Sequence, residues 1–110
     1  MVVLHARILI RPEARERWLS LVDSVAGPSR AEDPCHSYRI YEAIETPNSF
    51  IFVEEWETLD GLYHHFRTPH FTAFFRALPE VLAGPPDGSV YEVASTLTLN
   101  EALAAGGVSA

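Results

Sequence analysis

Residues 35–56 read CHSYRIYEAIETPNSFIFVEEW, and their pattern gives the clearest indication of the fold. Residues 35–44 and 50–56 are rich in aromatic and β-branched residues, and their side chains alternate between two faces, as in strands. Between them, residues 46–49 (TPNS) have the composition of a turn. Because so short a connection joins neighbouring antiparallel strands, the stretch is predicted to be a β-hairpin.

Outward from the hairpin toward the N-terminus, the pattern predicts a further strand and a helix. Residues 2–10 form an apolar, strand-like run, and Pro12 is suited to the first position of a helix. Apolar residues then recur at helical spacing: Ala14, Trp18, Leu21, Val22 and Val25. The pair Gly27-Pro28 is predicted to end or kink this helix.

Toward the C-terminus, two threonines mark the starts of two short helices. Thr58 and Thr68 are good N-cap residues, and Pro69 follows the second of them. The inward side chains of the second helix are expected to be Phe71, Phe74, Phe75, Leu78 and Leu82. A last strand is predicted over 89–99, followed by an Ala/Gly-rich tail over 101–110 that is expected to be frayed and flexible.

The order of these elements is strand, helix, strand, strand, helix in two pieces, strand. Four antiparallel strands with helices on one face make an α+β unit with the ferredoxin-like fold. The chain has 110 residues, shows no internal repeat and has room for one domain, which we expect to cover residues 1–100.

Both faces of the strand over 50–56 are apolar. Phe50, Phe52 and Trp56 lie on one face, while Ile51 and Val53 lie on the other. Helices can cover only one face of a sheet, and three bare aromatic rings would leave a large apolar area in water. The sequence therefore predicts a homodimer through the sheet face. The alternative is that strand twist and the C-terminal tail cover those rings within one chain.

Composition excludes several classes of partner. Eight basic and fifteen acidic side chains give a net charge of −7, which argues against nucleic acid and against anionic membrane surfaces. No apolar run is long enough to span a membrane, and the N-terminal residues do not resemble a signal peptide. The single cysteine, Cys35, excludes an intramolecular disulfide and suits a reducing, cytoplasmic compartment, where we expect it to be a structural free thiol.

The histidines are the first candidates for a metal-binding or catalytic role. Five histidines invite a metal interpretation, but His64 and His65 are adjacent on a helix and point about 100° apart. Because there is no HExxH motif and no Cys–His set, no metal site is predicted. His65 faces inward beside Phe66, so it is either a core-edge histidine or a proton acceptor at the mouth of an aromatic pocket.

Glu54 lies on the strand face that carries Phe52 and Trp56. A buried carboxylate needs a partner, and Arg7 and Arg39 on neighbouring strands are candidates. An ion pair at the dimer interface is therefore favoured, and catalysis is the alternative. A group of large rings either fills the core or lines a flat hydrophobic cavity: Trp18, Phe71, Phe74 and Phe75. No phosphate-binding loop or serine nucleophile motif is present.

Three motifs together resemble the antibiotic biosynthesis monooxygenase (ABM) domain family. They are residues 33–38 (DPCHSY), 52–56 (FVEEW) and 65–71 (HFRTPHF), in the family's order and spacing. The likeness covers about residues 2–99 and is closest to the quinol monooxygenases. Two departures are Pro34 and Glu13, each at a position where the family prefers glycine.

The resemblance implies a dimeric α+β barrel with a cavity in each subunit, and an oxygenase that uses no metal, flavin or haem. The expected reaction is oxidation of a hydroquinone or a polyketide-like phenol by O₂, with a small aromatic molecule and O₂ as the only small-molecule partners. Deprotonating a phenol at pH 7 costs about 4 kcal/mol, so a base is needed. His65 is expected to be that base, with Tyr38 and Trp56 orienting the substrate. The expected substrate contacts are Trp18, His70, Phe71, Phe74 and Phe75.

Other activities of the same fold remain as alternatives. Relatives that degrade haem use an asparagine, a tryptophan and a ligating histidine, whose positions correspond here to Ala6, His65 and Phe75. The missing imidazole at position 75 disfavours that activity, although His65 or His70 can substitute for it. An isomerase and a non-catalytic ligand-binding dimer are the further alternatives.

Overall fold

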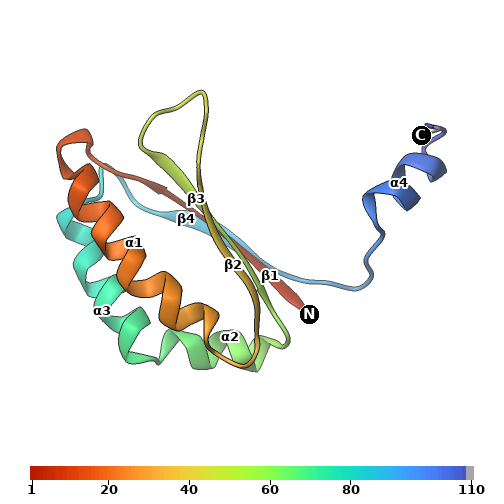
Figure 1. The fold of residues 1–110 in the computed structure, drawn as a ribbon, viewed down its shortest axis with the longest axis horizontal. Coiled ribbons are helices and arrows are strands. Elements are labelled where there is room, and N and C mark those ends of the chain that lie inside the picture. The colour runs from red at the N-terminus through yellow and green to blue at the C-terminus, as the bar shows by residue number, and fades with distance from the viewer. Residues whose placement is uncertain (109–110) are drawn as a thin grey trace.

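Four antiparallel strands form one sheet with the order β2-β3-β1-β4 in the computed structural model, which describes residues 1–108. Two helices, α1 and α3, cover one face of the sheet, and α2 lies at the end of that layer (Figure 1). The predicted α+β ferredoxin-like fold is confirmed, because strand order, pairing and helix placement all agree with it. None of the helices described has the length and apolar content needed to cross a bilayer.

The strands are β1 (Val2–Leu9), β2 (Cys35–Glu42), β3 (Ser49–Trp56) and β4 (Asp87–Glu92). The α-helices are α1 (Arg15–Arg30), α2 (Leu59–Phe66), α3 (Pro69–Ala77) and α4 (Leu99–Ala105), and two short 3₁₀ helices span Pro12–Ala14 and Leu78–Glu80. Both predicted threonine caps are present. The Thr58 and Thr68 hydroxyls accept hydrogen bonds from the backbone N–H groups of Gly61 and Phe71.

The core lies between the sheet and the helices and combines large rings with a larger number of aliphatic side chains. Trp18 of α1 is fully buried and packs against the rings of Phe50, Phe52 and Phe74 at centroid distances of 5.4–5.9 Å. Burial of these rings and of the aliphatic side chains around them stabilises the fold, because apolar area removed from water is the largest favourable term in folding.

The aromatic face of β3 is the face that the helices cover. Phe50, Phe52 and Trp56 are all buried, whereas Ile51 and Val53 point to the outer face of the sheet and are only half-buried. The reason given for a dimer, that three rings would otherwise lie bare, is therefore wrong. The helices cover these rings within one chain. Packing the large aromatic side chains under the helices removes more apolar area from water than packing Ile51 and Val53 there would.

Helix α1 continues past the pair Gly27-Pro28, where the sequence predicts an end or a kink. Pro28 lies in the last turn, so its missing N–H costs the helix one hydrogen bond near its end. Ser29 is fully buried and donates its hydroxyl to the Val25 carbonyl at 2.6 Å, and Arg30 Nε donates to the Tyr38 carbonyl at 2.9 Å. The first bond lies within the helix, and the second ties its last turn to β2.

The chain after the last strand also differs from the prediction. β4 ends at Glu92 rather than extending to residue 99, and its pairing with β1 requires Gly88, where a Cβ would lie 2.0 Å from the His5 carbonyl oxygen. Helix α4 (Leu99–Ala105) begins at the last residue of the predicted strand and includes residues 101–105 of the tail that was expected to be frayed, because Thr98 and Glu101 make a capping box. The helix stands away from the rest of the molecule (Figure 1). Residues 109–110 of that tail lie outside the described residues.

Candidate functional site

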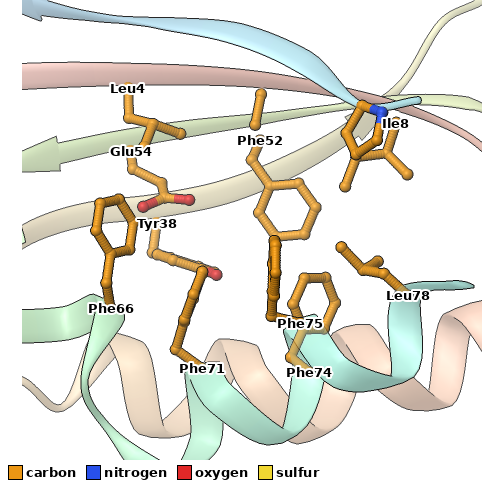
Figure 2. Close-up of a pocket in the computed structure, with 12 residues that line it drawn as sticks. Leu4, Ile8, Tyr38, Phe52, Glu54, Phe66, Phe71, Phe74, Phe75 and Leu78 are labelled. Atoms are coloured by element: carbon orange, nitrogen blue, oxygen red, sulfur yellow. The ribbon is translucent and has the colours of Figure 1, made fainter.

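A cavity of about 150 Å³ lies between the sheet and helix α3. Its lining consists of Leu4, Ala6, Ile8, Tyr38, Phe52, Glu54, Phe66, Phe71, Phe74, Phe75, Leu78 and Pro86. The strands supply its roof and the aromatic residues of the helices supply its floor (Figure 2). Phe75 and Pro86 are exposed, so one end of the cavity opens to solvent.

The aromatic floor follows from the spacing of the phenylalanines. Phe71, Phe74 and Phe75 lie on one side of α3 because positions three and four apart share a helix face. Phe71 and Phe75 stack at a centroid distance of 5.8 Å, and Phe66 of α2 lies 5.0 Å from Phe71. A flat apolar space enclosed by ring faces suits an aromatic ligand.

Glu54 is the one side chain of this lining that carries a carboxyl group. Alternation along β3 places it between Phe52 and Trp56 on the inner face, where it is only 5% exposed. Trp56 Nε1 donates a hydrogen bond to Glu54 Oε1 at 3.0 Å. Burial raises the pKa of Glu54 to about 7, although the hydrogen bond from Trp56 lowers it. Near neutral pH this carboxyl can therefore both accept and release a proton.

Tyr38 is the second polar group of the cavity. It pairs with Glu54 across the β2–β3 ladder and is 2% exposed. Burial, and then the nearby charge of Glu54, raise the pKa of the Tyr38 phenol. The phenol therefore stays protonated and can act as a hydrogen-bond donor, not as a base.

His65 does not line the cavity. It is fully buried one layer behind the cavity wall, with its ring 4.6 Å from that of Trp56, 5.1 Å from Phe71 and 5.8 Å from Tyr38. Burial lowers the pKa of His65 in spite of a hydrogen bond to Glu32. The imidazole is therefore neutral at pH 7, and its Nδ1–H donates to Glu32 Oε2 at 2.6 Å.

Glu32, in the connection between α1 and β2, also accepts from His70. The distance from His70 Nε2 to the same oxygen, Glu32 Oε2, is 2.8 Å. Two buried atoms of this cluster have no hydrogen-bond partner among the described residues, Glu32 Oε1 and His65 Nε2. The cluster ties the end of α1 to α2 and to the first turn of α3.

The predicted site residues thus divide into two groups. Tyr38, Phe71, Phe74 and Phe75 line the cavity together. The remaining four lie around it rather than in it: Trp18 in the core, Trp56 behind Glu54, and His65 and His70 in the Glu32 cluster.

From the sequence, Glu54 was assigned to a different place and Glu32 was missed. Glu54 was expected at a dimer interface with Arg7 or Arg39, but the structure turns it inward, away from both arginines, which lie on the outer face. The sequence did contain a signal for this inward orientation, because Glu54 shares its strand face with Phe52 and Trp56. Glu32 had no such signal, because its partners lie on other elements 33 and 38 residues away.

The raised pKa of Glu54 predicts that stability depends on pH. A group whose pKa rises from 4.5 to about 7 on folding stabilises the protein below pH 4.5, and this stability is lost as the pH rises through about 7. The expected loss is about 3 kcal/mol of unfolding free energy. Denaturant unfolding at pH 4.5, 6 and 8 measures it.

The control for this prediction is Glu54→Gln, which cannot ionise. The lowered pKa of His65 acts in the opposite direction, because stability falls as that imidazole is protonated at low pH. The difference between the two proteins isolates Glu54, since His65 is common to both. Equal pH dependence in the wild-type protein and the variant would contradict the assignment.

Comparisons with known proteins agree with this architecture. The family model described as "Antibiotic biosynthesis monooxygenase" matches residues 1–77. "Putative monooxygenase YcnE" of Bacillus subtilis is 36% identical over 87 residues, which cover 79% of this chain and 92% of that protein. "Uncharacterized protein sll1783" of Synechocystis is 37% identical over 98 residues, covering 89% of this chain and 67% of that protein.

One further relative can be compared both in sequence and in structure. "Putative monooxygenase Rv0793" of Mycobacterium tuberculosis is 33% identical over 84 residues, covering 76% of this chain and 82% of that protein. Its structure superposes with a TM-score of 0.82 at 29% identity, covering 88% of this chain and 98% of that one.

Proposed function

Because this chain belongs to the antibiotic biosynthesis monooxygenase family, we propose that it oxidises a hydroquinone or a similar phenol with O₂. We propose that it does so without a metal, flavin or haem in the reaction. The observation that carries the proposal is an apolar, ring-lined cavity whose polar side chains are a buried carboxyl, Glu54, and a buried phenol, Tyr38.

The size of the cavity favours a substrate with one ring. A cavity of about 150 Å³ lined by apolar side chains holds a molecule the size of benzene. A fused polyketide skeleton is larger than this space. Phe71 and Phe75, which stack on one another, offer faces and edges to one such ring.

Glu54 is the proposed proton acceptor. Electron transfer to O₂ requires an electron-rich phenolate, and a phenol has a pKa of about 10. A carboxylate with a pKa of about 7 can take that proton at a cost of about 4 kcal/mol, and a phenol donor at Tyr38 can stabilise the resulting anion. This assignment replaces His65, because Glu54 lines the cavity and His65 does not.

The reaction balances with O₂ as the only oxidant. The phenolate passes one electron to O₂, and the resulting superoxide and semiquinone combine through a new C–O bond. Proton return and loss of water break the O–O bond and leave a hydroxyquinone. One hydroquinone and one O₂ thus give one hydroxyquinone and one water, with all four electrons supplied by the substrate.

Trp56 and His65 are proposed to act through Glu54 as positioning residues. Trp56 Nε1 holds one carboxyl oxygen of Glu54, and the His65 ring packs on the Trp56 ring. Fixing the carboxyl in one rotamer keeps it directed into the cavity (Figure 2).

Oxygen uptake tests the proposal. Purified protein, treated with a chelator and dialysed, should consume O₂ with a panel of one-ring hydroquinones, one molecule of O₂ per hydroquinone. Turnover under strict anaerobiosis would indicate an isomerase instead, and tight binding without O₂ uptake would indicate a ligand-binding protein.

We also propose that the active form is a homodimer. The outer face of the sheet presents half-buried Val3, Ile51 and Val53 together with exposed Tyr41 and Tyr91. A second sheet would cover this face.

The C-terminal arm supports the same proposal. Residues after 93 leave the sheet, and helix α4 has seven residues, fewer than a helix needs to be stable alone in water (Figure 1). Leu99 and Leu103, which share one face of it, are 74% and 37% exposed. A second copy would give this face something to pack on.

Truncation of the arm is expected to weaken the dimer. A chain ending at Val93 loses the exposed leucines of the arm, so sedimentation should shift from dimer toward monomer at micromolar concentration. Val53→Glu, which places a charge on the outer face, should have the same effect because burying it is costly. A full-length chain that sediments as a monomer would contradict the proposal.

A further inference from the structure

Three side chains from one connection and two helices meet beside the cavity. Glu32 follows α1, His65 lies on α2, and His70 lies in the first turn of α3. One carboxylate oxygen, Glu32 Oε2, lies 2.6 Å from His65 Nδ1 and 2.8 Å from His70 Nε2. Each of the three residues offers one potential ligand atom, and these three atoms lie within 4.8 Å of one another.

The hydrogen bonds within this cluster leave it incompletely satisfied. Both imidazoles share one oxygen of Glu32, while the other oxygen, Oε1, is buried and has no partner among the described residues. The Glu32 side chain is only 10% exposed, so water does not readily reach that oxygen. A buried acceptor without a partner costs free energy, and a cation held by the carboxylate would remove that cost.

We propose that Glu32, His65 and His70 form a binding site for a divalent transition-metal ion of the Zn²⁺ type. Two imidazole nitrogens and a carboxylate are ligands that Zn²⁺ and its first-row neighbours prefer, whereas Mg²⁺ and Ca²⁺ prefer all-oxygen sites. The His70 side chain is 19% exposed, which gives an ion a path from solvent and leaves room for water as a further ligand.

Metal binding requires a modest local adjustment. The present N–O distances are those of hydrogen bonds. To bind an ion, each neutral imidazole would carry its proton on its other ring nitrogen, His65 Nε2 and His70 Nδ1, so that His65 Nδ1 and His70 Nε2 offer lone pairs to the metal. Metal–ligand bonds of about 2.0–2.2 Å in a tetrahedral arrangement place ligand atoms about 3.3–3.6 Å apart. Rotation of the side chains can bring the three groups to that separation, since His70 lies at the surface end of the cluster.

A bound ion would link α2, α3 and the segment after α1 without contacting a molecule bound in the cavity. His65 packs against Trp56 and against Phe71, whose ring lines the cavity. The ion would therefore hold the wall of the cavity in place, and it would have no part in the electron transfer proposed above. This inference stands independently of the proposed function.

Calorimetric titration of the full-length, chelator-treated protein with Zn²⁺ tests the proposal. We expect one ion per chain, a rise in the melting temperature with Zn²⁺, and neither effect with Mg²⁺. His70→Gln removes one ligand at a partly exposed position. It should weaken Zn²⁺ binding by more than the roughly 10- to 100-fold that loss of an outer-shell partner costs.

The matched control is His64→Gln. His64 neighbours His65 on α2 but is exposed and outside the cluster, so this variant should bind Zn²⁺ as the wild-type protein does. Glu32→Gln provides a second ligand variant, and circular dichroism shows which variants are folded. The proposal is overturned if the wild-type protein does not bind Zn²⁺ at one ion per chain, or if folded His70→Gln binds it equally well.

The two proposals fail separately. Zn²⁺ affinity is measured without substrate, and oxygen uptake is measured after chelation. If the protein binds Zn²⁺ but does not consume O₂ with any hydroquinone, only the oxygenase proposal is contradicted. If it consumes O₂ but does not bind Zn²⁺, only the metal site is contradicted.

Discussion

Glu54→Gln is expected to lower kcat for O₂-dependent hydroquinone oxidation by about 100- to 10,000-fold, the range that a general base contributes. Glutamine has nearly the same shape, and its carbonyl oxygen can still accept the hydrogen bond from Trp56 Nε1. It cannot accept a proton from the substrate. The variant should therefore keep its fold and its affinity for the quinone product while losing turnover.

The pH profile provides a second measure of the same assignment. Only the ionised carboxylate is a base, so kcat/KM of the wild-type protein should fall as the pH falls through about 7 and level off above it. The residual rate of Glu54→Gln should not show this step.

His65→Gln is the comparison that separates the two candidate bases. Because His65 lies behind the cavity wall, its replacement should reduce kcat less than Glu54→Gln does. If His65→Gln abolished turnover while Glu54→Gln kept it, the base would be His65, as the sequence alone suggests. Oxygen-electrode assays on the two folded variants decide between these outcomes.

Phe52→Ala is expected to destabilise the protein by about 3–5 kcal/mol, the usual cost of removing a buried ring. Phe52 is 2% exposed and packs against Trp18, Tyr38 and Phe74 at centroid distances of 5.7–5.9 Å. These neighbours belong to the sheet and to both covering helices, so they cannot all move into the space left behind.

Phe75→Ala makes the same chemical change at the mouth of the cavity. Phe75 is 59% exposed, so its loss should cost well under about 1 kcal/mol. Urea unfolding of the two variants measures the difference. A cost for Phe75→Ala that equalled that of Phe52→Ala would show that Phe75 is buried in solution, as it would be against a partner subunit.

Local patterns were sufficient to predict most of the fold. The hairpin over 35–56, the threonine caps at Thr58 and Thr68 and the apolar spacing from Trp18 to Val25 depend on residues close together in sequence. The misplaced boundaries have physical causes of the same local kind. Pro28 is tolerated because it falls in the last turn of α1, and the capping box at Thr98 starts a helix in an Ala/Gly-rich segment.

The site was only partly predictable. Helical spacing placed the phenylalanines of α3 on one side of the helix but left open whether they fill the core or line a cavity, and the family resemblance suggested the cavity that they line. The position of His65 relative to the cavity could not be predicted. The inward-facing residues of a helix include both those that line a cavity and those that lie behind its wall.

The order of the four strands and of helices α1 to α3, and hence the ferredoxin-like sheet, could thus be predicted from the sequence, because periodicity and capping are properties of neighbouring residues. Which face of β3 meets the helices depends on how the layers pack, and this packing makes Glu54 a buried carboxyl with a pKa of about 7 instead of the expected ion-pair partner at a dimer interface. The tertiary structure also brings together Glu32, His65 and His70, which no spacing connects. The physical reason is that burial and electrostatic environment are set by groups distant in sequence, so a side chain acquires its chemistry only when the chain has folded around it.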